Sequence, residues 1–169
     1  MLFSRQVAPK HDRIQINNVI RDSLYFTEPL CRQNKIEILT MLDEELPCIV
    51  GDFSQLRQVM VNLIVNSAQA MPDHGGTINV KTRCDDTGKV VLTVQDTGSG
   101  MTPETLSQCF MPFFTTKKVD EGTGLGLSVV HGIIKAHNAE IQVESQVGKG
   151  SEFTVYFPKA LEDGEKNVE

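Results

Sequence analysis

Three glycines within five residues, followed at once by an apolar helical pattern, restrict the possible folds of this chain more than any other feature. The stretch is EGTGLGLSVVHG, residues 121–132, and its glycines are Gly122, Gly124 and Gly126. A helix that begins in such a loop presents free backbone N–H groups and the positive end of its dipole, which favour an anion such as phosphate. The stretch therefore indicates either a phosphate-binding loop or a flexible turn that starts a helix.

Two common phosphate-binding loops are incompatible with this stretch. A Walker A loop requires Lys-Ser/Thr directly after its last glycines, whereas Leu127 and Ser128 stand there. A Rossmann loop requires a buried strand just before it and a third glycine one position later. The preceding residues, TTKKVDE, do not form such a strand. The flexible turn stays an equal alternative on this stretch alone, so other motifs have to decide.

Composition and charge narrow the class of protein. The 169 residues are enough for one domain with a substantial core, and the net charge of −6 argues against a general nucleic-acid binder. The longest apolar run, VMVNLIV, is too short to span a bilayer, so we expect a cytoplasmic domain, even if its parent protein is anchored in a membrane. Wide spacing favours free thiols over disulfides or zinc for Cys31, Cys48, Cys84 and Cys109.

The hydrophobic periodicity predicts an α+β two-layer sandwich. Its mixed, mostly antiparallel sheet of about five strands is covered on one face by three main helices. The predicted helices are 17–33, 52–71 and 125–137, with a short one at 103–109, and the predicted strands are 36–42, 77–83, 90–95, 140–145 and 152–157. Residues 13–16 are expected to be extended, and LPCIVGD is expected to be a turn-rich connection. Helix 52–71 is expected to begin at Asp52 as N-cap and to bury Phe53, Leu56, Met60, Leu63 and Ser67.

The helix 52–71 also carries a stripe of amide side chains. Asn62, Asn66 and Gln69 stand at i, i+4 and i+7 and therefore share one face. A solvated face is one interpretation, and for glutamine it is the better one. Asparagine is a mediocre helix former, and its amide oxygen can instead complete the oxygen shell of Mg²⁺ beside phosphates.

The motif DTGSGM, residues 96–101, places an aspartate at the end of a predicted strand, before two glycines. Taken alone it is a common turn. Alternatively, the carboxylate of Asp96 accepts a hydrogen bond from the exocyclic amine of a base, while Gly98 and Gly100 let the backbone approach the ring. Adenine presents such an amine and guanine presents a different edge, so this arrangement would select ATP over GTP.

Four motifs, which follow one another along the chain, resemble the N, G1, F and G2 boxes of the GHKL superfamily of ATP-binding domains. They are NLIVN, DTGSGM, FMPFFTTK and GTGLGLSVVHGI, and GKGSEFTVYFP resembles the closing loop and last strand of that family. Within the superfamily, the resemblance is to the catalytic domain of bacterial sensor histidine kinases, most of all the nitrogen-regulatory subgroup, and it covers residues 17–158. It implies a Bergerat fold that binds Mg-ATP between the helix layer and a flexible lid at 111–124.

The resemblance also implies roles for individual residues. Asn66 corresponds to the magnesium ligand and Asp96 to the adenine-binding carboxylate, and Phe113 and Phe114 either anchor the lid or pack in the core. The implied catalytic residues are Asn62, Asn66 and Lys117. The residues implied to bind the nucleotide are Asn62, Asn66, Gln69, Asp96, Gly98, Gly100, Met101, Phe114, Thr115, Thr116, Lys117, Gly122, Thr123, Gly124, Leu125, Gly126, Leu127 and Ser151.

The chain departs from the family pattern at three positions. ATP-hydrolysing relatives place a glutamate four residues before the magnesium asparagine, as a general base for water, but here Asn62 stands there and cannot take the proton. Gln69 replaces the Lys or Arg that many sensor kinases aim at phosphate, so Lys117 is a candidate for that charge. HNAE replaces a His-Gly-Gly turn, so Asn138 is expected to adopt the left-handed conformation.

The resemblance implies partners that this chain does not contain. The family phosphorylates a histidine in a His-Glu-x-x-x-Pro motif, which none of the four histidines has: His11, His74, His131 and His137. We therefore expect residues 1–12 to be a linker remnant from an upstream dimerisation and phosphoacceptor hairpin, 13–158 the catalytic domain, and 159–169 an acidic tail. The expected partners are that histidine-containing domain and a response regulator, without nucleic acid or direct membrane contact, and the isolated domain is expected to be a monomer. A serine kinase of the anti-sigma type and a regulatory nucleotide-binding module stay open as alternatives.

Overall fold

The structure is a computed structural model and describes residues 11–71, 74–116 and 124–161. Its strands are β1 Asp12–Ile14, β2 Ile36–Met41, β3 Ile49–Gly51, β4 Gly76–Cys84, β5 Val90–Asp96, β6 Glu140–Gln146 and β7 Gly150–Phe157. Its helices are α1 Ile16–Gln33, α2 Phe53–Gln69, α3 Pro103–Gln108 and α4 Gly126–Ala136.

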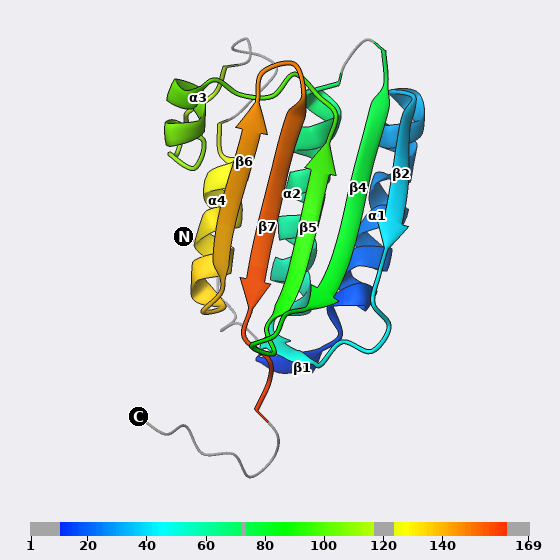
Figure 1. Ribbon diagram of the computed structural model, residues 1–169, viewed down its shortest axis with the longest axis vertical. Helices are drawn as coiled ribbons and strands as arrows, with labels where there is room; N and C mark the ends of the chain where they lie inside the picture. The colour runs from blue at the N-terminus through cyan, green and yellow to red at the C-terminus, as the bar shows by residue number, and fades with distance from the viewer. Residues whose placement is uncertain (1–10, 72–73, 117–123, 162–169) are drawn as a thin grey trace, which may run out of the picture.

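The main sheet has five strands in the order β2-β4-β5-β7-β6. β2 pairs with β4 in parallel, and the other three pairings are antiparallel. Figure 1 shows α1, α2 and α4 side by side behind this sheet, and no helix of the described residues covers its other face. The prediction of a two-layer α+β sandwich with a mixed, mostly antiparallel sheet and three main helices is confirmed.

A second, two-stranded sheet was not predicted as such. β1 and β3 pair antiparallel, so residues 49–51 are a strand within the segment expected to be a turn-rich connection. The strand has only three residues, and its partner lies far away in the sequence. Local sequence patterns carry little information on a pairing of this kind.

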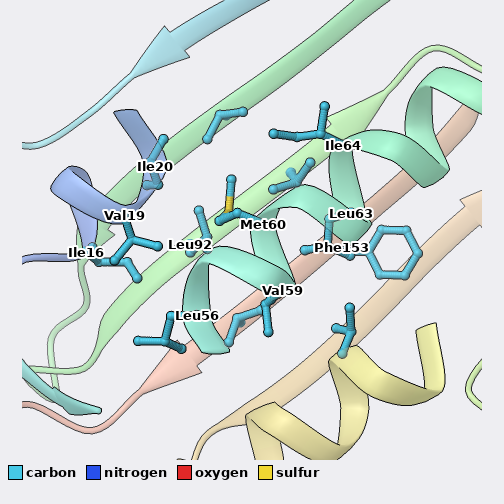
Figure 2. Close-up of a cluster of buried hydrophobic side chains, with 14 of the residues drawn as sticks. Ile16, Val19, Ile20, Leu56, Val59, Met60, Leu63, Ile64, Leu92 and Phe153 are labelled. Carbon is cyan, nitrogen blue, oxygen red and sulfur yellow. The ribbon is translucent and has the colours of Figure 1, made fainter. Parts of the chain in front are cut away.

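The core fills the space between the helices and the sheet. Figure 2 shows side chains of α1 and α2 meeting Leu92 of β5 and Phe153 of β7, all of them buried. The predicted apolar face of α2 is buried at Leu56, Met60 and Ser67, among others, but Phe53 is 39% exposed, so that part of the prediction is wrong. Phe53 is the first residue of α2, where the helix has no preceding turn to place it against the sheet.

Capping and turn geometry fix the ends of the helices. Asp52 is the N-cap of α2, and its carboxylate accepts a hydrogen bond from the Gln55 amide at 3.0 Å, as expected. Asn138 follows α4 with a φ of 52°, which confirms the predicted left-handed conformation. His137 is buried there, and its Nε2 accepts from the Asp52 amide, so this histidine joins the end of α4 to the start of α2. Among the described helices, none is long and apolar enough to cross a membrane.

The topology brings several predicted site segments to one end of the sheet. β5 ends there at Asp96, and the turn between β6 and β7 lies beside it (Figure 1). The C-terminal end of α2 lies at this end of the sheet, and α4 begins on the same side, somewhat further from the strand ends. The amide of Ser99 donates to the carbonyl oxygen of Ala70 at 3.1 Å, which ties the loop after β5 to the end of α2.

Candidate functional site

The carboxylate of Asp96 is at the centre of the candidate site. It lies at the end of β5 and is 2% exposed. Its Oδ1 accepts from the backbone amides of Gly98 at 2.8 Å and Ser151 at 3.3 Å, and its Oδ2 accepts from the Ser67 hydroxyl at 3.0 Å. Three elements therefore fix this side chain: the loop after β5, the start of β7 and the C-terminal half of α2.

Burial and hydrogen bonding act on the pKa of Asp96 in opposite directions. Burial raises the pKa above its ordinary value, because the charged form loses its hydration. The hydrogen bonds from Gly98, Ser67 and Ser151 lower it, and the net direction is upward. The three donors thus offset part of the cost of holding a carboxylate in a dry position, where a ligand can meet it without competing water.

Close packing explains two of the glycines in the loop after β5. A Cβ on Gly98 would lie 2.7 Å from the Ala70 Cβ and 2.8 Å from Asp96 Oδ1. Gly100 has a φ of 67°, and a Cβ there would meet the carbonyl oxygen of Gln146 at 2.0 Å. The sequence predicted that these glycines give a ring access to the backbone. In the structure, both press the loop against α2 and the β6–β7 turn, which requires glycine whether or not a ring is bound.

A serine pair joins this loop to the turn between β6 and β7. The Met101 amide donates to Ser145 Oγ at 2.8 Å, and the Oγ atoms of Ser145 and Ser151 lie 2.9 Å apart. Ser145 Oγ also donates to the Gly150 carbonyl at 3.0 Å. Met101 and Ser151, two predicted nucleotide-binding residues, are therefore linked by one network that also reaches Asp96.

The amide stripe of α2 faces the start of α4. The Asn62 side chain donates from Nδ2 to the carbonyl oxygen of Gly126, the first residue of α4, at 3.3 Å. Asn66, one turn further along α2, is half-buried, whereas Gln69 is exposed. Asn62 is thus brought beside the N-terminal end of α4, and Asn66 follows one turn later on the same face of α2.

The N-terminal end of α4 has features that are typical of an anion-binding helix end. Leu125 is the N-cap and forms no side-chain capping hydrogen bond. Its carbonyl accepts from the Val129 amide and from the Ser128 hydroxyl, each at 2.9 Å. Gly126 and Leu127 occupy the first turn, where backbone N–H groups have no carbonyl partner within the helix itself.

The segment before the glycine-rich stretch differs in part from expectation. Phe113 is 76% exposed, which excludes core packing, one of the two roles expected for it. It has a φ of 65°, and its amide donates to the Gly124 carbonyl at 2.9 Å. The aromatic ring that does reach the core belongs to Phe110, which stacks on His131 with centroids 5.2 Å apart and meets Phe153 edge-on at 6.4 Å.

The remaining predicted lid residues are only partly described. Phe114 is half-buried, and Thr115 and Thr116 are exposed. Lys117, Gly122 and Thr123 lie outside the described residues. Where the described chain resumes, Gly124 is half-buried beside Phe113.

Sequence reasoning missed three participants in this region. Ser67 was assigned to the buried face of α2, which is correct, but its bond to Asp96 was not foreseen. Phe110 was quoted only as part of FMPFFTTK and Ser145 only as the end of a predicted strand, and neither was given a role. The available signal for Ser67 was a hydroxyl within an otherwise apolar stripe, since a buried hydroxyl needs a partner.

The donor set at the amide stripe is compatible with a magnesium ion held mainly by phosphates. Groups of three or more His, Cys, Asp or Glu side chains that would form a metal cage by themselves are absent from the described residues. Mg²⁺ commonly takes only one or two protein oxygens together with phosphate oxygens and water. The amide oxygen of Asn66, one helical turn beyond Asn62 on α2, is a ligand of the type that fits this role.

Comparisons with known proteins agree with this geometry. Residues 51–161 match the family described as histidine kinase-, DNA gyrase B-, and HSP90-like ATPase. The chain is 40% identical to the sensor histidine kinase ZraS of Escherichia coli over 90% of its own length and 32% of that protein. It is 37% identical to the sensor kinase CckA of Brucella abortus over 96% of its length and 18% of that protein. The chain therefore spans about a third or less of these curated relatives.

Solved structures show the same fold. ShkA, in complex with AMPPNP, superposes with a TM-score of 0.79 at 27% identity, over 93% of this chain and 33% of that one. The nucleotide-free catalytic domain of the histidine kinase ThkA superposes with a TM-score of 0.77 at 31% identity, over 88% of this chain and 95% of that one. The chain belongs to the family of histidine kinase-, DNA gyrase B- and HSP90-like ATPases, as an ATP-binding catalytic domain of the sensor histidine kinase type.

Proposed function

We propose that this chain binds Mg-ATP and donates the γ-phosphoryl group to a histidine on a separate helical dimerisation and phosphotransfer domain. The observation that carries the proposal is the arrangement at one end of the sheet. A buried, backbone-anchored carboxylate lies at the end of β5, and the amide face of α2 meets the start of α4. This arrangement offers a place for a base and, beside it, a place for phosphates.

The proposed roles of the residues follow from their positions. Asp96 binds the adenine amine, and Gly98, Gly100 and Met101 line the base. The first turn of α4, with Gly124, Leu125, Gly126 and Leu127, directs N–H groups at the phosphates. Ser151 supports the base-binding carboxylate through its amide, at 3.3 Å from Oδ1. Phe114, Thr115, Thr116, Lys117, Gly122 and Thr123 are proposed for the lid side of the same site.

Transfer rather than hydrolysis is supported by Asn62. An amide cannot accept a proton from water at neutral pH, so this position provides no general base. Its Nδ2 also donates to the Gly126 carbonyl, which gives the side chain a structural task at the α2–α4 contact. Phosphoryl transfer depends on positioning and charge neutralisation, and both demands suit a site made of backbone amides and neutral side chains.

The charge of the phosphates requires more than these neutral groups. Asn66 would hold a magnesium ion through its amide oxygen, and the bound ion would neutralise phosphate charge during transfer. We assign Lys117 as the candidate protein cation, since Gln69 cannot supply one. Asn66 and Gln69 stand three residues apart on α2, so both face the phosphate end of the proposed site.

The wider setting is proposed on the same basis. The phosphoacceptor domain precedes residue 13 in a longer protein, the catalytic domain covers residues 13–158, and a response regulator receives the phosphoryl group. The location is cytoplasmic and the isolated domain is a monomer. The sequences FMPFFTTK and GLSVVHGIIKAH support membership in the nitrogen-regulatory subgroup of sensor kinases.

Incubation with γ-labelled ATP, Mg²⁺ and a separately purified histidine-containing hairpin domain tests the proposal. Acid-labile, base-stable label on the hairpin is the expected result, because phosphohistidine hydrolyses in acid. Acid-stable label on a partner protein would instead identify a serine kinase, and ATP binding without any label would identify a regulatory module. A hairpin with its histidine replaced by alanine is the matched control and must stay unlabelled.

A further inference from the structure

We infer that Ser67 is a positioning residue for base recognition. Its hydroxyl holds Asp96 Oδ2 so that one remaining acceptor site on that oxygen faces the 6-amino group of adenine in a fixed direction. The inference rests on the proposed ATP-binding function and deepens it, since it names the atom that reads the base and the group that aims it.

The setting of Ser67 distinguishes it from the other buried hydroxyls on the helices. It continues the apolar stripe of α2 and is fully buried. A hydroxyl in such a place costs free energy unless it is hydrogen-bonded. Buried Ser23 and Thr27 of α1 meet this need within their own helix, by donating to the carbonyls of Val19 at 2.7 Å and Ser23 at 2.9 Å. Ser67 instead donates across to another element, to Asp96 Oδ2 at 3.0 Å.

The acceptor capacity of Asp96 identifies the oxygen that is left for a ligand. A carboxylate has about four lone-pair sites, two on each oxygen. Backbone amides of Gly98 and Ser151 occupy both sites on Oδ1, and Ser67 occupies one on Oδ2. The remaining site is therefore on Oδ2, next to the serine hydroxyl. Because the last torsion of an aspartate is soft, the bond from Ser67 is what fixes the direction of that site.

A purely structural role for Ser67 predicts a different result from a positioning role. If the hydroxyl only satisfies the core, its loss should weaken the binding of every nucleotide to the same degree. If the hydroxyl fixes the direction of Oδ2, its loss should weaken the binding of only those nucleotides that carry a 6-amino group. The matched ligands are ATP and purine riboside 5′-triphosphate, which lacks that group and keeps the ring, ribose and phosphates.

Calorimetric titration of the Ser67→Ala domain with both ligands, in the presence of Mg²⁺, tests the inference. We expect the affinity for ATP to fall about tenfold, the affinity for the purine analogue to stay within about twofold, and the ratio of the two to approach one. The matched control is Ser23→Ala, which removes a buried hydroxyl from α1 and should keep the wild-type ratio. Ser67→Cys preserves the volume with a weaker donor and should give an intermediate ratio; it carries the test if the alanine variant does not fold.

Two results would overturn the inference, and they are distinguishable. A wild-type domain that prefers ATP, together with Ser67→Ala and Ser67→Cys variants that keep the same preference, would assign Ser67 to the core alone and leave the adenine role of Asp96 intact. A wild-type domain that binds both triphosphates equally would remove the adenine role of Asp96 itself, and with it the proposed task of Ser67.

Discussion

At the scale of single residues, Asp96 shows a conflict between binding and stability. Its pKa is raised from the ordinary 3.8 by burial, despite three hydrogen bonds that lower it. A carboxyl whose pKa is higher in the folded state stabilises the fold while it is protonated. That contribution is fully present below pH 3.8 and is lost as the pH rises through the raised folded value. At neutral pH the ionised carboxylate therefore costs stability, which a role in binding would justify.

The variant Asp96→Asn should separate these two effects. The amide oxygen can keep the bonds from Gly98 and Ser151, and the Ser67 hydroxyl can turn to accept from the amide nitrogen. We expect the nucleotide-free variant to be as stable as the wild type or more so, with its advantage growing as the pH rises above about 4. Urea denaturation over this pH range measures the effect.

The same variant should bind ATP more weakly, because an amide N–H would then face the amine of adenine. Both groups are hydrogen-bond donors, so no bond forms between them. We expect at least a roughly tenfold drop in affinity by calorimetry. An Asp96→Asn domain that binds ATP as tightly as the wild type would contradict the proposed role of the carboxylate. A domain that gains no stability relative to the wild type as the pH rises would contradict the assigned cost of its burial.

Residue-scale prediction from sequence succeeded where the signal was local and failed where it was not. The burial of Ser67 followed from helical spacing, and the capping role of Asp52 followed from its place before an apolar helix. The bond between Ser67 and Asp96 joins residues that are distant in the chain. It depends on how β5 lies against α2, which no periodicity encodes. The exposure of Phe113 likewise depends on its own left-handed backbone conformation and on its bond to the distant Gly124 carbonyl.

At the scale of elements, the long helices and the main sheet were predictable because their hydrophobic periods are strong. The β1–β3 pair was not, since two three-residue strands carry almost no pattern. The position of the short helix α3 followed from Pro103 at its start, and its Thr102 cap is present. What the pattern could not provide was the meeting of α2, α4 and the β6–β7 turn at one end of the sheet, which arises from the order of the strands.

The capping of α2 gives an element-scale prediction. Asp52→Ala removes the acceptor of the Gln55 amide from a helix that supplies much of the core. We expect a loss of about 1 kcal/mol in the free energy of unfolding, measured by urea denaturation. Thr102→Ala removes the corresponding cap of α3, which has no buried residues, and should cost clearly less. Equal losses for the two variants would contradict the view that the packing of a helix determines how much its cap contributes to the free energy of unfolding.

The packing of the segment that follows α3, which contains Phe110 and Phe113, gives a second prediction at the scale of elements. Phe110 packs on His131 of α4 and Phe153 of β7, whereas Phe113 is exposed. Phe110→Ala should therefore lower the free energy of unfolding by about 2 kcal/mol, and Phe113→Ala should change it by less than about 0.5 kcal/mol. Thermal unfolding of the two variants beside the wild type checks this difference. A larger loss from Phe113→Ala would mean that Phe113 anchors the segment after all.

At the scale of the whole molecule, binding and folding are linked, because a ligand that binds only the folded chain stabilises it by mass action. The proposed site draws on α2, α4, β5 and the β6–β7 turn, so Mg-ATP should raise the unfolding temperature of the domain as one unit. At a free nucleotide concentration of about 100 times the dissociation constant, the gain is about 2.7 kcal/mol. For a domain of this size, that corresponds to a rise of roughly 5–10 °C.

The magnesium-dependent part of this rise should depend on Asn66. We expect the wild type to be stabilised more by ATP with Mg²⁺ than by ATP with a chelator, and the difference to disappear in Asn66→Ala, because the amide oxygen that would hold the ion is gone. Gln58→Ala, on the exposed surface of the same helix, is the matched control and should keep the full difference. Differential scanning fluorimetry with and without EDTA measures both variants. If Asn66→Ala keeps the wild-type response to Mg²⁺, the ion is held by phosphates and other groups, and the assignment of Asn66 as its ligand is wrong.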